Sequence, residues 1–176
     1  MKVFVAGTKT VKELDDTAKA KMLSITKKKY EVLVGDCYGV DASVQRFLSD
    51  IGYTNVRVFA SNGYARNNVG NWPINNIPVN RSKRGFDYYK QKDVAMAKEA
   101  DCGFMIWDGK SRGTLNNIIN LVSDKKTVLL YLPAIHKTFV IEDLKKLHDT
   151  FGGDLHQATP QNHGRSNDYG QVSLFV

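Results

Sequence analysis

The sequence predicts an α/β fold with three layers, in which helices cover both faces of a mostly parallel, five-stranded sheet. Short apolar runs alternate with segments whose apolar residues recur at helical spacing. The connections between successive runs are long enough for the crossover helix that parallel strands require. This alternation favours the Rossmann-like strand order 3-2-1-4-5, in which the order reverses between the first and fourth strands.

The first half of the chain contains three of the predicted strands. They cover Lys2–Ala6, Glu31–Val34 and Val56–Ala60. A helical period follows the first strand, with one apolar face formed by Val11, Leu14, Ala18, Met22 and Ile25. Another follows the second strand and ends at Gly52, with a buried face formed by Val40, Val44, Phe47, Leu48 and Ile51.

The segment from Ser61 to Arg84 interrupts this rhythm. It is rich in Asn and Gly, and a loop of that length is typical of a lid, a binding loop or a mobile segment. The alternation then resumes. We expect a helix at about Phe86–Ala100, a strand at Cys102–Trp107, a helix with Leu115, Ile118, Ile119 and Val122 inward, a strand at Thr127–Leu132, and a helix at about Ile141–Thr150.

The chain divides by composition near residue 151. Residues 1–151 form the predicted Rossmann-like domain. Residues 152–170 are polar with almost no apolar side chain, which predicts a flexible tail. Residues 171–176, QVSLFV, are apolar again.

The composition indicates where in the cell the protein is located and which kinds of partner it binds. No apolar run approaches the roughly 20 residues that cross a bilayer, and no secretory signal is recognisable, so we expect a cytoplasmic protein without a membrane partner. The net charge of +7 favours anionic partners such as nucleotides or nucleic acid, although a lysine-rich solvated surface explains it equally well. We expect Cys37 and Cys102 to be free buried thiols, and the sequence has no metal-ligand spacing and no cofactor motif.

Loops with glycine and small polar residues follow the strands that meet where the strand order reverses. Ligands of open α/β sheets bind in the crevice at this point. The candidate ligand-binding residues of the first two loops are Gly7, Thr8, Lys9, Gly35, Asp36, Gly39 and Asp41. Helix amides after Gly39 would favour an anion. Asp41 is a candidate helix cap, which we favour, or an acceptor for a ribose hydroxyl.

The loop after the fourth strand, DGKSRGT, repeats this chemistry. Gly113 and Thr114 would open the next helix with amides directed at a phosphate, which Lys110 or Arg112 would neutralise. The alternative is an ordinary strand-to-helix turn. The candidate ligand-binding residues here are Gly109, Lys110, Ser111, Arg112, Gly113 and Thr114.

These motifs resemble a known superfamily. GDCYGVDASV and DGKSRGTLNNI, with QKDVAMAKEAD between them, are similar to the SLOG superfamily and in particular to its YspA-like members. The resemblance covers about residues 1–133 and implies a Rossmann-like fold, a nucleotide or nucleotide-derived ligand, and a homodimer. Related members are LOG-type phosphoribohydrolases, DNA-processing protein A, and sensor domains beside antiviral effectors. An Arg of the LOG-type enzymes corresponds approximately to Lys92, which makes Lys92 a candidate ligand-binding residue.

The LOG-type pattern continues with a catalytic Glu after Gly-Thr-x, where this chain has Asn116 and Asn117. An Asn side chain neither takes a proton nor supplies a full negative charge, as cleavage of an N-glycosidic bond requires. Asp108 is the best-placed substitute carboxylate and the candidate catalytic residue. Other carboxylates near the predicted crevice are Asp36, Asp41, Asp87 and Asp93.

The long segment Ser61–Arg84 supplies further candidates. Trp72, Arg81 and Arg84 would cover a base and bind phosphate if this segment closed over the site. The alternative is a mobile surface loop with Trp72 packed against the body.

The C-terminal QVSLFV resembles the peptide that binds the bacterial sliding clamp. Gln171 would make polar contacts, and Leu174 and Phe175 would insert into apolar pockets. The alternative is an edge strand that pairs with the sheet.

Three functions thus remain open on sequence alone: nucleotide binding without cleavage, nucleoside 5′-monophosphate N-glycosidase activity, and binding of single-stranded nucleic acid. The clamp peptide would link each of them to DNA replication in a bacterial or phage-infected cell.

Overall fold

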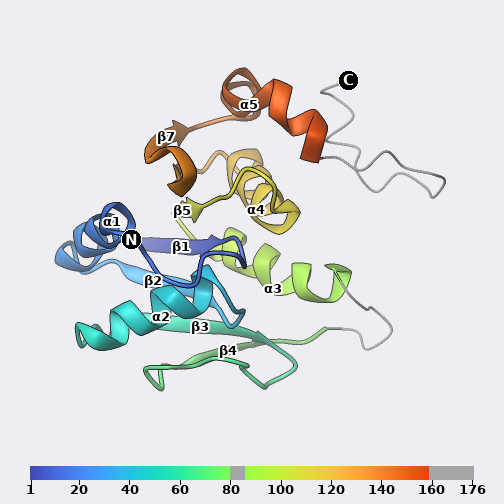
Figure 1. The fold of residues 1–176 in the computed structure, drawn as a ribbon. Coiled ribbons are helices and arrows are strands. Elements are labelled where there is room, and N and C mark those ends of the chain that lie inside the picture. Colours follow the sequence, from blue (N-terminus) through green and yellow to red (C-terminus); the bar gives the residue numbers. More distant parts are fainter. Residues whose placement is uncertain (80–85, 159–176) are drawn as a thin grey trace.

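The computed structural model describes residues 1–79 and 86–158 (Figure 1). The strands are β1 (Lys2–Gly7), β2 (Glu31–Gly35), β3 (Val56–Ser61), β4 (Ile74–Ile77), β5 (Cys102–Ile106), β6 (Val128–Leu132) and β7 (Lys137–Ile141). The helices are α1 (Asp16–Lys27), α2 (Val40–Asp50), α3 (Phe86–Glu99), α4 (Arg112–Ser123) and α5 (Leu144–Ala158), with a 3₁₀ turn at Pro133–Ile135.

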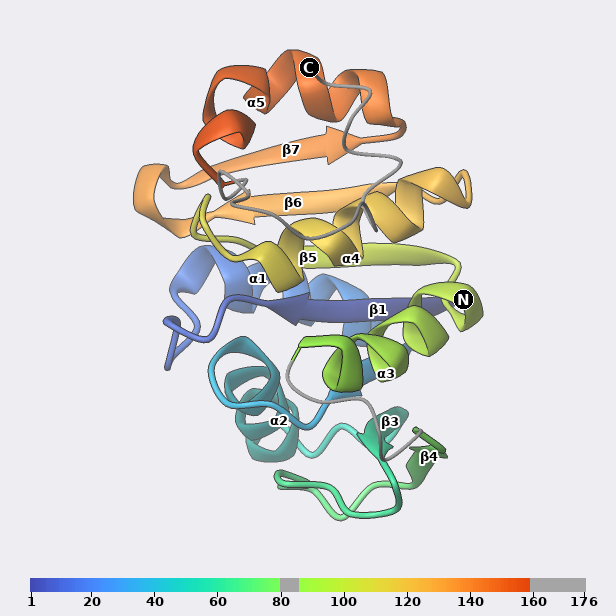
Figure 2. The ribbon, with the colours of Figure 1, turned by 90° about the vertical axis from the view of Figure 1, so that its right-hand side faces the viewer.

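The sheet confirms the α/β class and the mostly parallel arrangement, but the predicted strand number and order were wrong. It has seven strands in the order β4-β3-β2-β1-β5-β6-β7, as Figure 2 shows from bottom to top. All pairs are parallel except β6 with β7. The five predicted strands form the centre, and one further strand lies at each edge.

Both missed strands lie at sheet edges, where a strand needs little apolar sequence. β4 reads INNI and lies within the segment predicted to be a loop. Its residues are exposed or half-buried, because only β3 pairs with it. β7 follows β6 after the 3₁₀ turn and His136, whose φ of 50° reverses the chain. Short edge strands of this kind carry no clear period-2 pattern.

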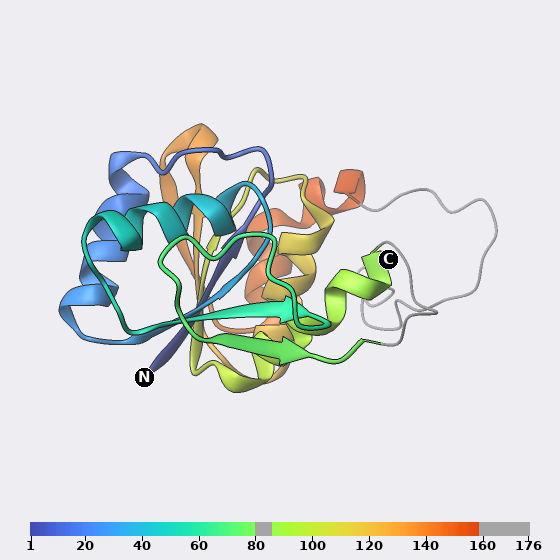
Figure 3. The same ribbon diagram turned by 90° about the horizontal axis from the view of Figure 1, so that it is seen from below.

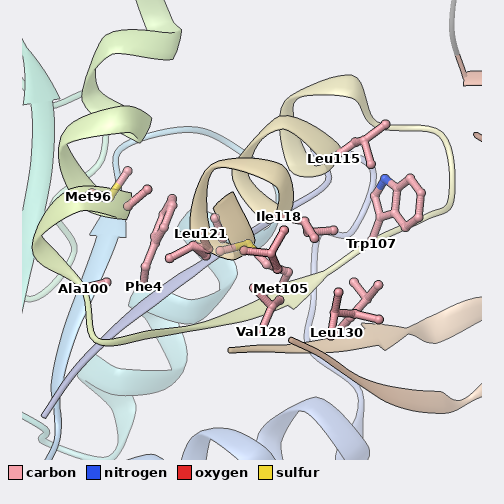
Figure 4. Close-up of a cluster of buried hydrophobic side chains, with 14 of the residues drawn as sticks. Phe4, Met96, Ala100, Met105, Trp107, Leu115, Ile118, Leu121, Val128 and Leu130 are labelled. Carbon is pink, nitrogen blue, oxygen red and sulfur yellow. The ribbon is translucent and has the colours of Figure 1, made fainter. Parts of the chain in front are cut away.

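Helices cover both faces of the sheet, in agreement with the predicted three layers (Figures 1 and 3). On one face, α1 and α2 pack over a cluster that includes Val5, Met22 and Val44. On the other, α3, α4 and α5 pack over the cluster of Figure 4, which includes Phe4, Met105 and Trp107. Burial of the two clusters removes apolar surface from water. This stabilises the packing of the helices against the sheet by about 25 cal/mol per Å² of buried apolar surface.

The last helix is longer than predicted. α5 continues to Ala158, so the predicted start of the polar tail at residue 152 falls within this helix. Gln171, Leu174 and Phe175 lie outside the described residues. Within residues 1–79 and 86–158, no helix has the length and apolar character needed to span a membrane.

Candidate functional site

The strand order reverses between β1 and β5, and the turns after these two strands contact each other. The amide of Thr8 donates to the carbonyl of Ile106 at 3.0 Å. The hydroxyl of Thr8 donates to Asp108 Oδ2 at 2.6 Å, and that of Thr10 donates to the same oxygen at 3.2 Å. Thr8 and Asp108 therefore lie together at the point where we expected the crevice.

Asp108 organises the turn in which it lies. Its Oδ1 accepts hydrogen bonds from the amides of Lys110 at 2.9 Å and Ser111 at 2.7 Å. Partial burial alone would raise its pKa, but the hydrogen bonds from Thr8, Lys110 and Ser111 outweigh burial and lower the pKa of Asp108 below its usual value. Asp108 is thus an ionised acceptor whose two oxygens already have protein donors.

The turn after β5 leads into α4 and leaves backbone accessible. α4 begins at Arg112, and Ser111 is its N-cap, with Ser111 Oγ accepting from the Thr114 amide at 3.4 Å. A Cβ atom added to Gly109 or Gly113 would meet nothing within 4 Å. Lys110 and Arg112 are exposed, whereas Thr114 is buried. The start of α4 thus carries two cationic residues, Lys110 and Arg112, between two glycines whose Cβ positions are open.

The turn after β2 is closed by the protein itself. Gly39 has φ of 80°, and a Cβ there would lie 2.4 Å from the Cα of Lys9. The first amide of α2, on Val40, donates to the carbonyl of Thr8 at 3.1 Å. A Cβ on Gly35 would lie 2.3 Å from Asp41 Oδ2 and 2.7 Å from Lys92 Nζ. Side chains and neighbouring backbone therefore occupy the positions where we expected an anion.

The prediction that Asp41 caps α2 was wrong. The N-cap of α2 is Gly39, and no side chain caps the helix. Asp41 is only 5% exposed, and its Oδ2 accepts from the Cys37 amide at 3.2 Å. Its carboxylate points back toward the β2 turn, where Lys92 lies.

Lys92 is the centre of a buried charged cluster formed with Asp36, Asp41 and Asp93. It is 2% exposed, and its Nζ lies 2.8 Å from Asp93 Oδ1 and 3.9 Å from Asp36 Oδ1. Burial opposes its charge, but the surrounding carboxylates outweigh burial and raise the pKa of Lys92. Burial also raises the pKa of Asp41, to about 6, against the opposing effect of Lys92.

Arg66 extends this cluster from the segment after β3, and no motif or spacing in the sequence pointed to it. Its Nε and Nη2 donate to the two oxygens of Asp36 at 3.0 and 2.9 Å, and its backbone amide donates to Asp36 Oδ2 at 3.1 Å. Burial alone would raise the pKa of Asp36, but these bonds and the charge of Lys92 lower it. Arg66 Nη2 also donates to Cys37 Sγ at 2.9 Å, so it joins the loops after β2 and β3.

The remaining candidates are placed as follows. Trp72 is 6% exposed and its Nε1 donates to the Tyr53 carbonyl at 3.0 Å, so it packs against the body, as in the alternative interpretation, and does not present its ring to a base. Arg81 and Arg84 lie outside the described residues. Cys37 and Cys102 are free, as expected, but half-buried rather than buried.

A groove lies where the start of α1 faces the ends of β5 and β6. Its volume is about 200 Å³. The lining residues are Val11, Glu13, Leu14, Asp15, Ala18, Ile106, Tyr131 and Pro133. The lining is mainly apolar, and its polar groups are two carboxylates and one phenol.

Comparison of the chain with protein-family models gave no match, and comparison with curated proteins gave none either.

Proposed function

We propose that the chain is a SLOG-type domain that binds a nucleotide or a nucleotide-derived molecule at the turn after β5 and does not cleave it. The observation that carries the proposal is the uncovered N-terminus of α4, where Gly109 and Gly113 have nothing within 4 Å of an added Cβ. Backbone without side-chain cover lets a phosphate approach the amides closely. Exposed Lys110 beside it supplies the opposite charge.

The position of this turn supports a ligand rather than a purely structural role. It lies at the point where the strand order reverses between β1 and β5, which is where open α/β sheets bind ligands. The contact between Thr8 and Asp108 fixes the turn against the end of β1 without using the amide of Gly113. The site is therefore held in shape before a ligand arrives.

The experiment is calorimetry with AMP, GMP, CMP, UMP, ADP-ribose and cyclic nucleotides, compared with adenosine. We expect binding of at least one phosphate-bearing compound and weaker binding of the nucleoside. Gly113→Ala is the decisive variant, because its methyl group fits the folded protein but obstructs the amides. It should lower affinity at least about tenfold without lowering the melting temperature, while Lys27→Gln, at the far end of α1, leaves affinity unchanged. Absence of binding across the panel would refute the proposal.

The alternative of an N-glycosidase requires Asp108 to act on water or sugar. Its lowered pKa argues against a role as general acid at neutral pH, and its two oxygens already accept bonds from Thr8, Lys110 and Ser111. Chromatography after incubation with nucleoside monophosphates tests the alternative. Release of free base that Asp108→Asn abolishes would replace binding with hydrolysis as the function.

The C-terminal sequence QVSLFV motivates a separate proposal, that the domain attaches to a bacterial sliding clamp through Gln171, Leu174 and Phe175. Pull-down of purified clamp with the full chain and with a chain that ends at Ala158 tests it. Equal recovery by both chains would remove the clamp from the function.

A further inference from the structure

Two tyrosines stand out on the edge of the sheet where the candidate site lies. Tyr38 is 67% exposed and Tyr64 is 77% exposed, the two largest exposed fractions among the large apolar residues that the structure describes. Tyr38 follows β2 and Tyr64 follows β3. Because parallel strands end at the same edge, both rings lie at the carboxyl edge, as do the turns after β1 and β5.

The rings are exposed, but the loops that carry them are held by buried carboxylates. Next to Tyr38, the amide of Cys37 donates to Asp41 at 3.2 Å. Two residues after Tyr64, the Arg66 amide donates to Asp36 at 3.1 Å. The bond from Arg66 to Cys37 Sγ, at 2.9 Å, joins the two loops. Exposed aromatic rings on fixed loops present a surface at little entropic cost on binding.

Cationic residues lie next to the two tyrosines along the carboxyl edge, and the four residues together form a row. Gly39, next to Tyr38, packs directly against the backbone of Lys9 after β1. Thr8, next to Lys9, bonds to Asp108, and Lys110 follows two residues later. Lys9 and Lys110 are both exposed. Across β3, β2, β1 and β5, the carboxyl edge therefore carries two aromatic residues followed by two cations.

The row is longer than one nucleotide. The four strands are separated by three spacings of about 4.8 Å, so the row spans about 14 Å. Successive phosphates on a stacked strand are only about 3.4 Å apart along the axis. Aromatic faces stack on any base, and cations beside them follow the phosphates.

We infer that the ligand has at least two bases joined through phosphate, either a dinucleotide or a segment of single-stranded nucleic acid. Its bases stack on Tyr38 and Tyr64, and a phosphate lies between Lys9 and the turn of Lys110 and Gly113. This inference rests on the proposed function, because it uses the same phosphate site. It adds the residues that read the bases and the class of ligand.

The experiment compares three single-stranded probes labelled at the 3′ end: a mononucleotide, a dinucleotide and an octanucleotide. Fluorescence anisotropy at fixed salt gives their affinities. We expect the dinucleotide to bind roughly 5- to 150-fold more tightly than the mononucleotide, which corresponds to about 1–3 kcal/mol for one stacked base. A further increase with the octanucleotide identifies a nucleic-acid strand, and equal affinity for the two longer probes identifies a dinucleotide.

Ring replacements test the tyrosines directly. Tyr38→Leu and Tyr64→Leu should each weaken dinucleotide binding by roughly 5- to 150-fold, while Tyr38→Phe and Tyr64→Phe keep the ring and the affinity. Val140→Ala is a control at an exposed apolar residue of β7, at the other end of the sheet.

The outcomes separate this inference from the proposed function. Mononucleotide binding that Gly113→Ala weakens, combined with no gain for the dinucleotide or no effect of the Leu variants, would overturn the inference alone. Failure of all three probes to bind would overturn the inference, and absence of binding across the calorimetry panel as well would overturn both.

Discussion

Lys92 offers the sharpest test of how the structure assigns roles at this edge of the sheet. The sequence predicted that it binds ligand, whereas in the structure its ammonium group lies inside a cluster of protein carboxylates. Replacing it with Met keeps most of the apolar stem and removes the ammonium group, with its charge and its hydrogen bond to Asp93. Asp36, Asp41 and Asp93 would then lose their shared cation.

The magnitude follows from burial. Lys92 is 2% exposed, Asp36 is 3% exposed and Asp41 is 5% exposed, so water replaces little of the lost interaction. Removing one partner of a buried ion pair costs about 3–5 kcal/mol. For a protein of this size each kcal/mol lowers the melting temperature by about 2–4 °C, so Lys92→Met should melt about 6–20 °C below the parent protein.

Urea unfolding and thermal melts of Lys92→Met measure this effect. The matched control is Lys90→Met, the same substitution two residues earlier on α3 at a half-buried position, which should change stability by less than about 0.5 kcal/mol. If Lys92→Met were no less stable than Lys90→Met and instead lost affinity for nucleotides, the structural role would be wrong and the sequence prediction right.

Three other variants test neighbouring features. The folded-state pKa of Asp41, about 6, exceeds the ordinary value of 3.8 for an aspartate, so its proton stabilises the fold below about pH 4 and that stability is lost as pH rises through 6. In urea unfolding, Asp41→Asn should therefore gain about 2 kcal/mol relative to the parent between pH 4 and pH 7, and an equal difference at both pH values would contradict the raised pKa. Gly39→Ala should lower the free energy of unfolding by at least about 1 kcal/mol, because Gly39 has φ of 80° and an added Cβ would meet the Lys9 backbone at 2.4 Å. An unchanged melting temperature would exclude that contact. Trp72→Ala should cost about 3–5 kcal/mol, because Trp72 is 6% exposed and bonded to Tyr53, whereas a value within 1 kcal/mol of zero would show that the ring is not packed.

The sequence was sufficient to predict the central strands of the sheet but not its two edge strands. The central strands are apolar on both faces, as VFVA of β1 and VLV of β2 are, because helices cover both sides. β4 contains two asparagines in four residues and is held by backbone pairing to β3. Backbone pairing at an edge requires no side-chain pattern, so the period-based reasoning had nothing to detect.

At the candidate site, the sequence predicted which loops come together but not which groups fill the space between them. The contact of Thr8 with Asp108 follows from strand order alone, once the reversal between the strands at Lys2 and Cys102 is assumed. The role of Lys92 depends on the rotation of α3, which brings one of its lysines over β2. Arg66 reaches Asp36 from a segment with no regular spacing, so no motif could have paired them.

Gly35 after β2 and Gly113 after β5 lie in similar turns, but the surroundings of the two glycines differ. This difference bears on where a ligand would fit. Gly35 lacks a side chain because the head groups of Asp41 and Lys92 occupy the space that a Cβ would need. Gly113 has nothing within 4 Å of that position, and as a residue in the first turn of a helix it would be more stable as alanine. A glycine that costs helix stability without relieving any internal contact needs a reason outside the folded chain. Under the proposed function, close approach of a phosphate to the α4 amides is such a reason, and it would put the phosphate over β5 and β1, with the bases extending toward the loops after β2 and β3.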